Sequence, residues 1–261
     1  MDIDILLTNG GAEVDIDRVR RLKNMSHGTF GSKIARELLQ LMDAKDRLTF
    51  LTAKVSHSTF SREINWYGLG ESEADDELME LLELRKMERL HRHHYDEFRY
   101  RTFREYHMAV ESRLKRMATM TKRTGSMGIV VLAAAISDYL VKNYIDGKVR
   151  STQQLSIELE PSPKIIGLIK EQCPECRLVG FKLLVDSTDE DLICAARNSA
   201  VDNGCDFVVA NDLRDIVQGE HRVLLVNKDG LVATHHTDPD DPNYLARIVA
   251  NRVLCMQRIK S

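Results

Sequence analysis

A short segment near the amino terminus combines small polar residues in a pattern that suits an anion. Asn24-Met25-Ser26-His27-Gly28 stands directly before a predicted helix over 32–42. Backbone N–H groups and the dipole at such a helix N-terminus favour a phosphate or a carboxylate. Helix capping alone also favours Ser, Thr and Gly at this place, so a purely structural role stays open.

A second candidate is the carboxylate that follows an apolar run. Residues 130–136 read Val-Val-Leu-Ala-Ala-Ala-Ile without a charge, as in a parallel strand that is buried on both faces. The alanines leave room for a ligand or a backbone, and Asp138 follows where open α/β sheets bind their ligands. The run predicts either the floor of a small-molecule site or a core strand whose alanines accept a close helix.

Two other clusters contain residue types that bind metals, but neither has the partners that a metal site needs. His91-Arg92-His93-His94 lacks carboxylate or cysteine partners nearby, and Cys173-Pro174-Glu175-Cys176 is a lone CxxC pair. We expect no metal site at either place. We expect the CxxC pair to lie in a solvent-facing loop between a helix and a strand.

The composition is that of an ordinary globular protein. The chain has 261 residues, of which 43% are hydrophobic and 30% charged, and its formal net charge is −3. This charge gives no global argument for binding to nucleic acid or membrane, and no apolar run approaches the roughly 20 residues that span a bilayer. From the acidic amino terminus and five scattered cysteines we expect a cytoplasmic protein with reduced thiols.

Strands and helices alternate along the chain, which predicts the elements that position these residues. Residues 71–124 are highly charged with apolar residues at three- and four-residue steps, as in a solvated helical insertion. Residues 155–159 alternate strictly, as in a half-exposed antiparallel strand. The fold class is therefore α/β: a single domain over 1–261 with a doubly wound, mostly parallel Rossmann-like sheet. Strands are expected at 3–7, 48–55, 64–69, 177–184 and 206–212, a hairpin at 223–226 and 231–233, and helices at 32–42, 190–201 and from 242 onward.

Several short motifs, in their order along the chain, resemble those of the phosphopantothenate–cysteine ligase family. Its Gly-Gly turn, Val-Arg pair and Asn-x-Ser-x-Gly match Gly10-Gly11, Val19-Arg20 and Asn24–Gly28. Its Ala-Ala-Val-(Ala/Ser)-Asp-Tyr strand end matches Ala134–Tyr139, and its Lys-Ile-Lys/Ser matches Lys148–Ser151.

The resemblance continues through the second half of the chain. The family's Pro-Lys-Ile/Met-Ile/Leu, Gly-Phe-Lys-Leu and Ala-Asn-Asp match Pro163–Ile166, Gly180–Leu183 and Ala210–Asp212. The Phe-Lys-Leu version is similar to stand-alone ligases. One departure is a helical lysine pair of many bacterial members, which falls near Ser199 and Asn203 here.

The resemblance implies a two-step ligation in coenzyme A biosynthesis. The carboxylate of 4′-phosphopantothenate attacks the α-phosphate of CTP or ATP, with Mg²⁺ present, and gives an acyl-nucleotide and pyrophosphate. The amine of L-cysteine then attacks the acyl carbon and releases the nucleoside monophosphate. The similarity of Phe181–Asp186 to short bacterial forms favours CTP.

The resemblance also implies a role for each matching residue. Lys148 would neutralise the phosphate in the first step and Asn24 would donate its amide to the acyl carbonyl, which makes them the expected catalytic residues. A homodimer is implied, with an antiparallel flap over 140–160 near the contact. The expected substrate-binding residues are Arg20, Asn24, Ala135 and Asn211. The expected nucleotide-binding residues are Gly10, Gly11, Ser26, Gly28, Leu132, Ala133, Ala134, Asp138, Pro163, Lys164, Ile165, Ile166 and Phe181.

Two rival functions stay open from the residues alone. An NAD(P)-binding oxidoreductase would carry GxGxxG or a Tyr-x-x-x-Lys pair, whereas Gly10-Gly11 is a plain pair and Tyr139 has Asn143 at that spacing. A non-catalytic module would bind a partner through the charged region 71–124. In that case Lys148 is a surface lysine and Asn24 a loop asparagine that bonds to its own backbone.

Overall fold

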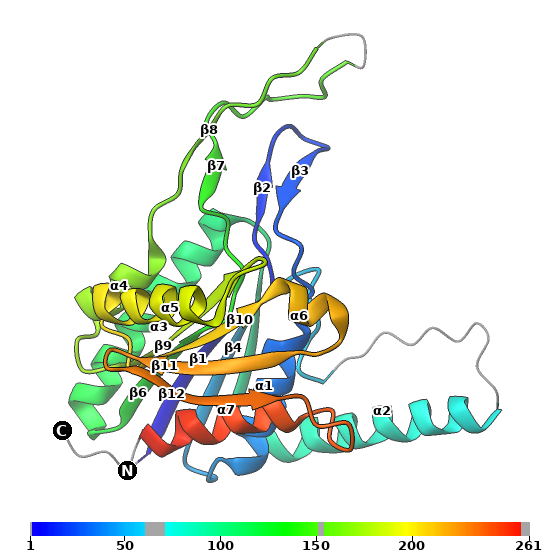
Figure 1. Ribbon diagram of the computed structural model, residues 1–261, viewed down its shortest axis with the longest axis vertical. Helices are drawn as coiled ribbons and strands as arrows, with labels where there is room; N and C mark the ends of the chain where they lie inside the picture. The colour runs from blue at the N-terminus through cyan, green and yellow to red at the C-terminus, as the bar shows by residue number, and fades with distance from the viewer. Residues whose placement is uncertain (1, 61–70, 151–153, 257–261) are drawn as a thin grey trace.

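A mixed sheet runs through the part of the chain that the computed structural model describes, which is residues 2–60, 71–150 and 154–256. The sheet has eight strands in the order β12-β11-β10-β9-β6-β1-β4-β5 (Figure 1). The strands from β10 to β5 in this order are parallel, whereas β11 and β12 join antiparallel at one edge. The bounds are Ile3–Asn9 for β1, Arg47–Ala53 for β4, Tyr95–Tyr100 for β5, Met127–Leu132 for β6, Arg177–Leu184 for β9, Phe207–Asp212 for β10, Arg222–Asn227 for β11 and Gly230–His236 for β12. The predicted doubly wound α/β fold is confirmed.

Helices cover both faces of the sheet, which explains the uninterrupted apolar runs in the central strands. In β1, Ile5 and Leu7 pack on one face with α1 (Thr29–Leu41) and α7 (Tyr244–Cys255), while Leu6 packs on the other. Successive strand residues point to opposite faces, so a strand covered on both sides needs apolar residues throughout. The second face is covered by α3 (Phe103–Thr124), α4 (Ile165–Gln172) and α5 (Asp189–Asn203).

The region 71–124 differs from the predicted helical insertion. Only α2 (Glu71–His91) is a helix that extends away from the sheet (Figure 1). β5 follows it as the edge strand of the main sheet, and α3 packs on the core through buried residues such as Tyr106 and Leu114. β5 carries charged residues because an edge strand contacts a neighbour on one side only.

Two antiparallel arms rise beyond the carboxyl ends of the parallel strands (Figure 1). One arm is the hairpin of β2 (Glu13–Asp15) and β3 (Arg21–Lys23). The other pairs β7 (Tyr139–Val141) with β8 (Leu159–Pro161) and corresponds to the predicted flap. The alternating run 155–159 predicts the second strand of this flap, whereas pairing in the structure begins only at Leu159.

The remaining sequence-based expectations have mixed outcomes. The predicted strand 64–69 lies outside the described residues. The predictions of a solvent-facing CxxC loop and of reduced thiols are both wrong for this pair, because Cys173 and Cys176 are each 1% exposed and form a disulfide with each other at the end of α4. A short helix, α6 (Leu213–Gln218), follows β10 without a matching prediction. Within the described residues, no helix is long and apolar enough to cross a membrane.

Candidate active site

Three segments meet at the carboxyl ends of β1 and β6, and one of them, at Ala135, lies 111 residues after Asn24. The backbone N–H of Ala135 donates to the carbonyl oxygen of Gly10 at 2.8 Å, and Gly11 forms an isolated bridge with Ala135. The side-chain amide of Asn24 donates to the carbonyl oxygen of Ala135 at 3.3 Å. A Cβ atom on Gly11 would lie 3.1 Å from the carbonyl oxygen of Asn24, so glycine allows this close approach. The predicted glycine turn, polar loop and alanine segment therefore contact one another at one site.

The polar loop ends at the N-terminus of α1. Gly28 is the N-cap with a φ of 72°, and no side chain caps the helix. A Cβ atom at Gly28 would lie 2.5 Å from Nδ2 of the buried Asn9, which donates to Thr52 Oγ1 at 3.2 Å. Free first-turn N–H groups favour an anion here. Asn9 was not among the predicted residues, although it stands directly before Gly10-Gly11 at the end of the first predicted strand.

Asp138 and the start of α4 form a second part of the edge. Lys164 pairs with the carboxylate of Asp138, and both side chains are exposed. Ser162 donates its N–H to the carbonyl oxygen of Asp138 and its hydroxyl to that of Ser137, each at 2.8 Å. These bonds bring Pro163 to Ile166 beside Asp138. The predicted residues Leu132, Ala133 and Ala134 lie half-buried between this part and the glycine turn, and Ala134 N–H donates to Thr8 Oγ1 at 3.3 Å.

Phe181 and Asn211 lie further along the same edge, on β9 and β10. Phe181 is half-buried and meets the ring of Phe30, on the first turn of α1, edge to face with centroids 6.3 Å apart. Asn211 is buried, and its Nδ2 lies 2.8 Å from Nε2 of His221. Burial and the charge of Lys33 lower the pKa of His221, so its imidazole is neutral at pH 7. No pattern in the sequence singles out His221.

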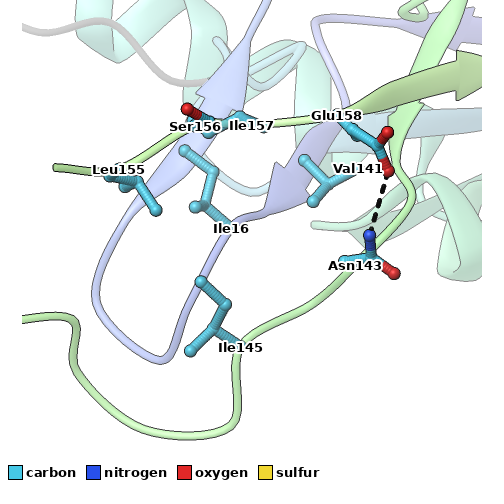
Figure 2. Close-up of a pocket in the computed structure, with 8 residues that line it drawn as sticks. All are labelled: Ile16, Val141, Asn143, Ile145, Leu155, Ser156, Ile157 and Glu158. Carbon is cyan, nitrogen blue, oxygen red and sulfur yellow. Dashed lines mark hydrogen bonds between the residues drawn. The ribbon is translucent and has the colours of Figure 1, made fainter.

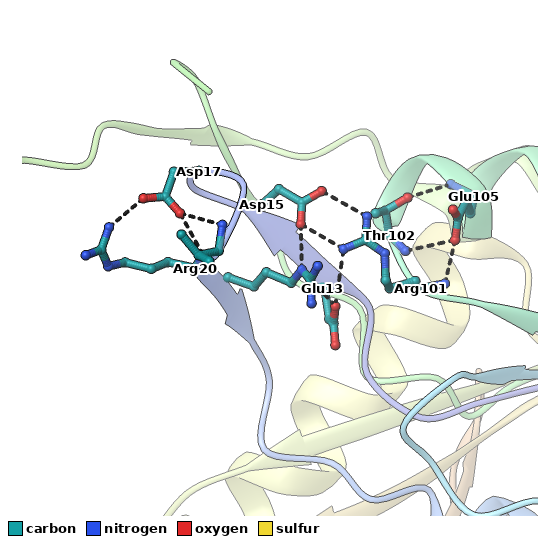
Figure 3. A network of polar contacts seen from close by, with 9 residues as sticks. Glu13, Asp15, Asp17, Arg20, Arg101, Thr102 and Glu105 are labelled. Carbon is teal, nitrogen blue, oxygen red and sulfur yellow. Dashed lines mark hydrogen bonds and ion pairs between the residues drawn. The ribbon is translucent and has the colours of Figure 1, made fainter. Parts of the chain in front are cut away.

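Arg20 and Lys148 lie away from this edge, on the arms. Arg20 pairs with Asp17 at the tip of the β2–β3 hairpin, in the polar network that Figure 3 shows. The neighbours of Lys148 bond to the same tip, since Arg18 N–H donates to Gly147 O at 3.0 Å. Asn24 follows β3 at the base of the hairpin, four residues after Arg20, which is about 13 Å of extended chain. One chain therefore holds Asn24 and Lys148 at opposite ends of the hairpin.

A chain of ion pairs anchors this hairpin to the domain (Figure 3). Arg101 donates to Asp15 at 3.0 and 3.2 Å, and Arg21 donates to the same carboxylate at 2.8 Å. Glu105 completes a capping box with Thr102 at the start of α3. The hairpin is thereby tied to the strand–helix junction that precedes α3.

A groove of ≈ 180 Å³ lies between the two arms (Figure 2). Its sides are mostly aliphatic, and a hydrogen bond of 3.2 Å from Asn143 to Glu158 closes one side. The lining residues are Ile16, Val141, Asn143, Ile145, Leu155, Ser156, Ile157 and Glu158. This lining suits an apolar side chain better than a phosphate.

Comparison with known proteins places the chain in a family of pantothenate metabolism proteins. Residues 102–255 match the family model described as the DNA/pantothenate metabolism flavoprotein C-terminal domain. The chain is 34% identical over 226 residues to the coenzyme A biosynthesis bifunctional protein CoaBC of Thermococcus kodakarensis, covering 86% of this chain and 45% of that protein. It is 28% identical over 133 residues to phosphopantothenate–cysteine ligase 2 of Oryza sativa subsp. japonica, covering 49% of this chain and 39% of that protein. The chain thus spans less than half the length of these curated relatives.

Solved structures support the fold. The DNA/pantothenate metabolism flavoprotein from Streptococcus pneumoniae superposes with a TM-score of 0.70 at 24% identity, covering 98% of this chain and 99% of that one. A Cab2 mutant in complex with phosphopantothenate-cysteine superposes with a TM-score of 0.77 at 18% identity, covering 99% of this chain and 89% of that one. At these identities the likeness concerns the arrangement of strands and helices.

Proposed function

Because this chain belongs to the phosphopantothenate–cysteine ligase family, through its DNA/pantothenate metabolism flavoprotein C-terminal domain, we propose that it joins 4′-phosphopantothenate to L-cysteine. A nucleoside triphosphate, CTP or ATP, activates the carboxylate as an acyl-nucleotide. The amine of cysteine then takes the acyl group and nucleoside monophosphate leaves. The substrates and the order of steps come from the family resemblance, and the geometry of the site supports them.

The observation that carries the proposal is the junction of Asn24, Gly11 and Ala135. An exposed amide stands there beside the uncapped N-terminus of α1, so one edge offers both a single aimed donor and a set of N–H groups. In the second step negative charge develops on the acyl oxygen when the amine attacks. The Asn24 amide would donate to that oxygen, and such a donor acts on the transition state more than on the substrate. Arg20, Ala135 and Asn211 are proposed to orient phosphopantothenate and cysteine.

The first step brings a carboxylate against a triphosphate, so it needs positive charge. Lys148 is proposed to neutralise the attacked phosphate, with Lys164 close to Asp138 at the nucleotide side. Asp138 fits a role as a Mg²⁺ ligand, because Mg²⁺ binds nucleotides through one or two carboxylates and takes its other ligands from phosphates and water. Mg²⁺ would supply further charge neutralisation when bound. The described residues contain no cluster of three or more metal-binding side chains, so the other ligands are proposed to be phosphate oxygens and water.

The separation of Lys148 from Asn24 within one chain leads to a proposal about assembly. We propose that two copies pair through the arms, so that Lys148 of one copy reaches the edge of the other. The arms expose apolar side chains that a second copy would cover: Tyr139 and Tyr144 are 54% and 52% exposed, and Leu159 is 47% exposed. The groove of Figure 2 adds aliphatic residues to this surface.

Sedimentation equilibrium tests the pairing. We expect a dimer at micromolar concentration, and we expect Ile157→Lys in the groove to shift it to monomer. Val232→Lys, at an exposed position on the edge strand β12, is the matched control and should leave the dimer intact. A monomer of the unchanged chain would contradict the pairing.

A reaction with purified components tests the function. The chain is incubated with 4′-phosphopantothenate, L-cysteine, Mg²⁺ and either CTP or ATP, and the amide product is identified by mass spectrometry. We expect product with at least one nucleotide, and the ratio of rates gives the preference. Absence of product with both nucleotides would contradict the proposal, and binding of NADPH in the same preparation would favour an oxidoreductase.

A further inference from the structure

The carboxylate of Asp17 sits at the tip of the β2–β3 hairpin and holds two segments at once. Its side chain has no exposed surface. Oδ1 accepts from the N–H groups of Val19 and Arg20 at 2.8 and 2.7 Å, and Oδ2 accepts from Nη1 of Arg20 at 2.5 Å. Oδ2 also accepts from the N–H of Val149 at 3.2 Å, although Val149 is 132 residues away in the sequence. The hydrogen bonds outweigh the effect of burial and lower the pKa of Asp17 to about 2, so the group is charged throughout the physiological range.

The segment that Asp17 holds contains Lys148. Ile145 N–H donates to Ile16 O at 3.0 Å, and Gly147 O accepts from Arg18 N–H at 3.0 Å. On the other side of Lys148, Val149 donates to Asp17 and its carbonyl oxygen accepts from Nη2 of Arg20 at 3.3 Å. The backbone is therefore bonded to the hairpin tip immediately before and immediately after Lys148.

The side chain of Lys148 itself is left exposed by this arrangement. Among the described residues it has no ion pair or hydrogen bond. A lysine side chain is long and flexible, and its ammonium is well placed only when the backbone that carries it is fixed. The glycine at 147 would make this segment loose if the hairpin did not hold it.

We propose that Asp17 is a positioning residue for Lys148. It acts together with Arg20, whose guanidinium links the same carboxylate to Val149 O. Arg20, which is proposed above to orient phosphopantothenate and cysteine, thus also completes the clamp on residues 147–149. The inference rests on the proposed function for its kinetic consequence, whereas the clamp itself is testable without any activity.

Hydrogen exchange measured by mass spectrometry tests the clamp. We expect the peptide over 145–150 to exchange faster in Asp17→Ala than in the unchanged protein, with Asp17→Asn in between because an amide oxygen can still accept. Asp15→Asn is the matched control, since it removes a carboxylate from the same hairpin that makes no hydrogen bond to residues 147–149. Equal exchange of this peptide in the unchanged protein and both Asp17 variants would overturn the clamp.

A double-mutant cycle tests whether the clamp serves Lys148. We expect Asp17→Asn to slow nucleotide-dependent pyrophosphate release by about a hundredfold, the cost typical of a catalytic group displaced by about 1 Å. In a Lys148→Gln background the same change should have no further effect, because the lysine that it positions is gone. A loss of equal size in both backgrounds would overturn the positioning role. Absence of pyrophosphate release from the unchanged protein would contradict the proposed function instead, and hydrogen exchange would then decide the clamp alone.

Discussion

Asn24 donates its side-chain amide to the carbonyl oxygen of Ala135 across 111 residues of sequence, at a distance of 3.3 Å. This bond joins the polar loop before α1 to the segment after β6, at the carboxyl edge of the sheet. The Nδ2 group carries two hydrogens, so one can bond to Ala135 O while the other donates to a ligand. We therefore expect the bond to Ala135 to hold Asn24 near the reacting position while its second N–H group meets the substrate.

Replacing Asn24 by Asp should separate the two half-reactions. A carboxylate keeps the size of the side chain but cannot donate a hydrogen bond, and it would repel an acyl oxygen that gains negative charge. We expect pyrophosphate release to persist and amide formation to fall by about a hundredfold or more. Both are followed in one reaction by phosphate assay and mass spectrometry. Asn198→Asp, on the exposed side of α5, is the control and should leave both steps unchanged. Equal loss of both steps in Asn24→Asp would contradict the role.

Replacing Lys148 by Gln should stop the reaction earlier. Without its charge the attack of a carboxylate on a triphosphate is opposed by repulsion, so we expect pyrophosphate release itself to fall to a small residual rate. Lys142→Gln removes a lysine from the same arm, where it pairs with Glu158, and should retain release. Normal pyrophosphate release by Lys148→Gln would contradict a role of this lysine in the first step.

The glycine that starts α1 offers a test of the loop geometry. Gly28→Ala places a Cβ atom 2.5 Å from Asn9, in a backbone conformation with a φ of 72°. Gly125→Ala is a close control, because Gly125 has a φ of 71° and no atom within 4 Å of an added Cβ. Gly125→Ala should lower the free energy of unfolding by about 1–2 kcal/mol, because of the left-handed conformation alone. Gly28→Ala should cost more, because Asn9 is buried and must move. If urea unfolding shows the same loss of unfolding free energy in both variants, the contact with Asn9 does not contribute to stability.

Stability at low pH should depend on Asp212, which is buried at the end of β10. Burial alone raises the pKa of this carboxyl, but hydrogen bonds from the hydroxyl and N–H of Ser187 and from the N–H groups of Arg214 and Asp186 lower it to about 2. The ordinary pKa of an unfolded Asp is about 3.9. The folded pKa is the lower one, so the stabilisation is complete above about pH 4 and is lost as the pH falls toward about 2.

Urea unfolding between pH 2 and 7 checks this linkage. Asp212→Asn should be less stable than the unchanged protein at pH 7, and the difference should shrink between about pH 4 and about pH 2. Asp202→Asn, exposed on α5, serves as the control and should follow the unchanged protein. A difference that stays constant over the whole range would contradict the assignment to Asp212.

The central sheet is predictable from the sequence because its strands are buried on both faces. Residues such as Val130 and Val131 belong to a continuous apolar run of strand length, which is typical of a parallel strand between two helical layers. The sequence does not reveal β5, because Asp96, Glu97 and Arg99 at an exposed edge continue the charged pattern of the preceding helix. The β2–β3 hairpin is also hidden, since its strands have three residues each and its anchor, Arg101, is 86 residues from Asp15.

The candidate site divides in the same way. Gly10 stands directly after β1 and the loop 24–28 directly before α1, so their place at the carboxyl edge of the sheet is predictable, as is that of Ala135 shortly after β6. The clamp of Asp17 on Val149 is not, because nothing local in either segment indicates a partner 132 residues away. His221 likewise has no local signal, and only the pairing of β10 with β11 brings it near Asn211.

In the first step that we propose, the carboxylate of phosphopantothenate attacks the α-phosphate of the nucleotide. Phosphopantothenate labelled with oxygen-18 in its carboxylate tests this directly, with mass spectrometry of every phosphate product after the amide has formed. We expect the nucleoside monophosphate to carry one labelled oxygen and pyrophosphate to carry none. Label in inorganic phosphate, or no label in any phosphate product, would contradict it.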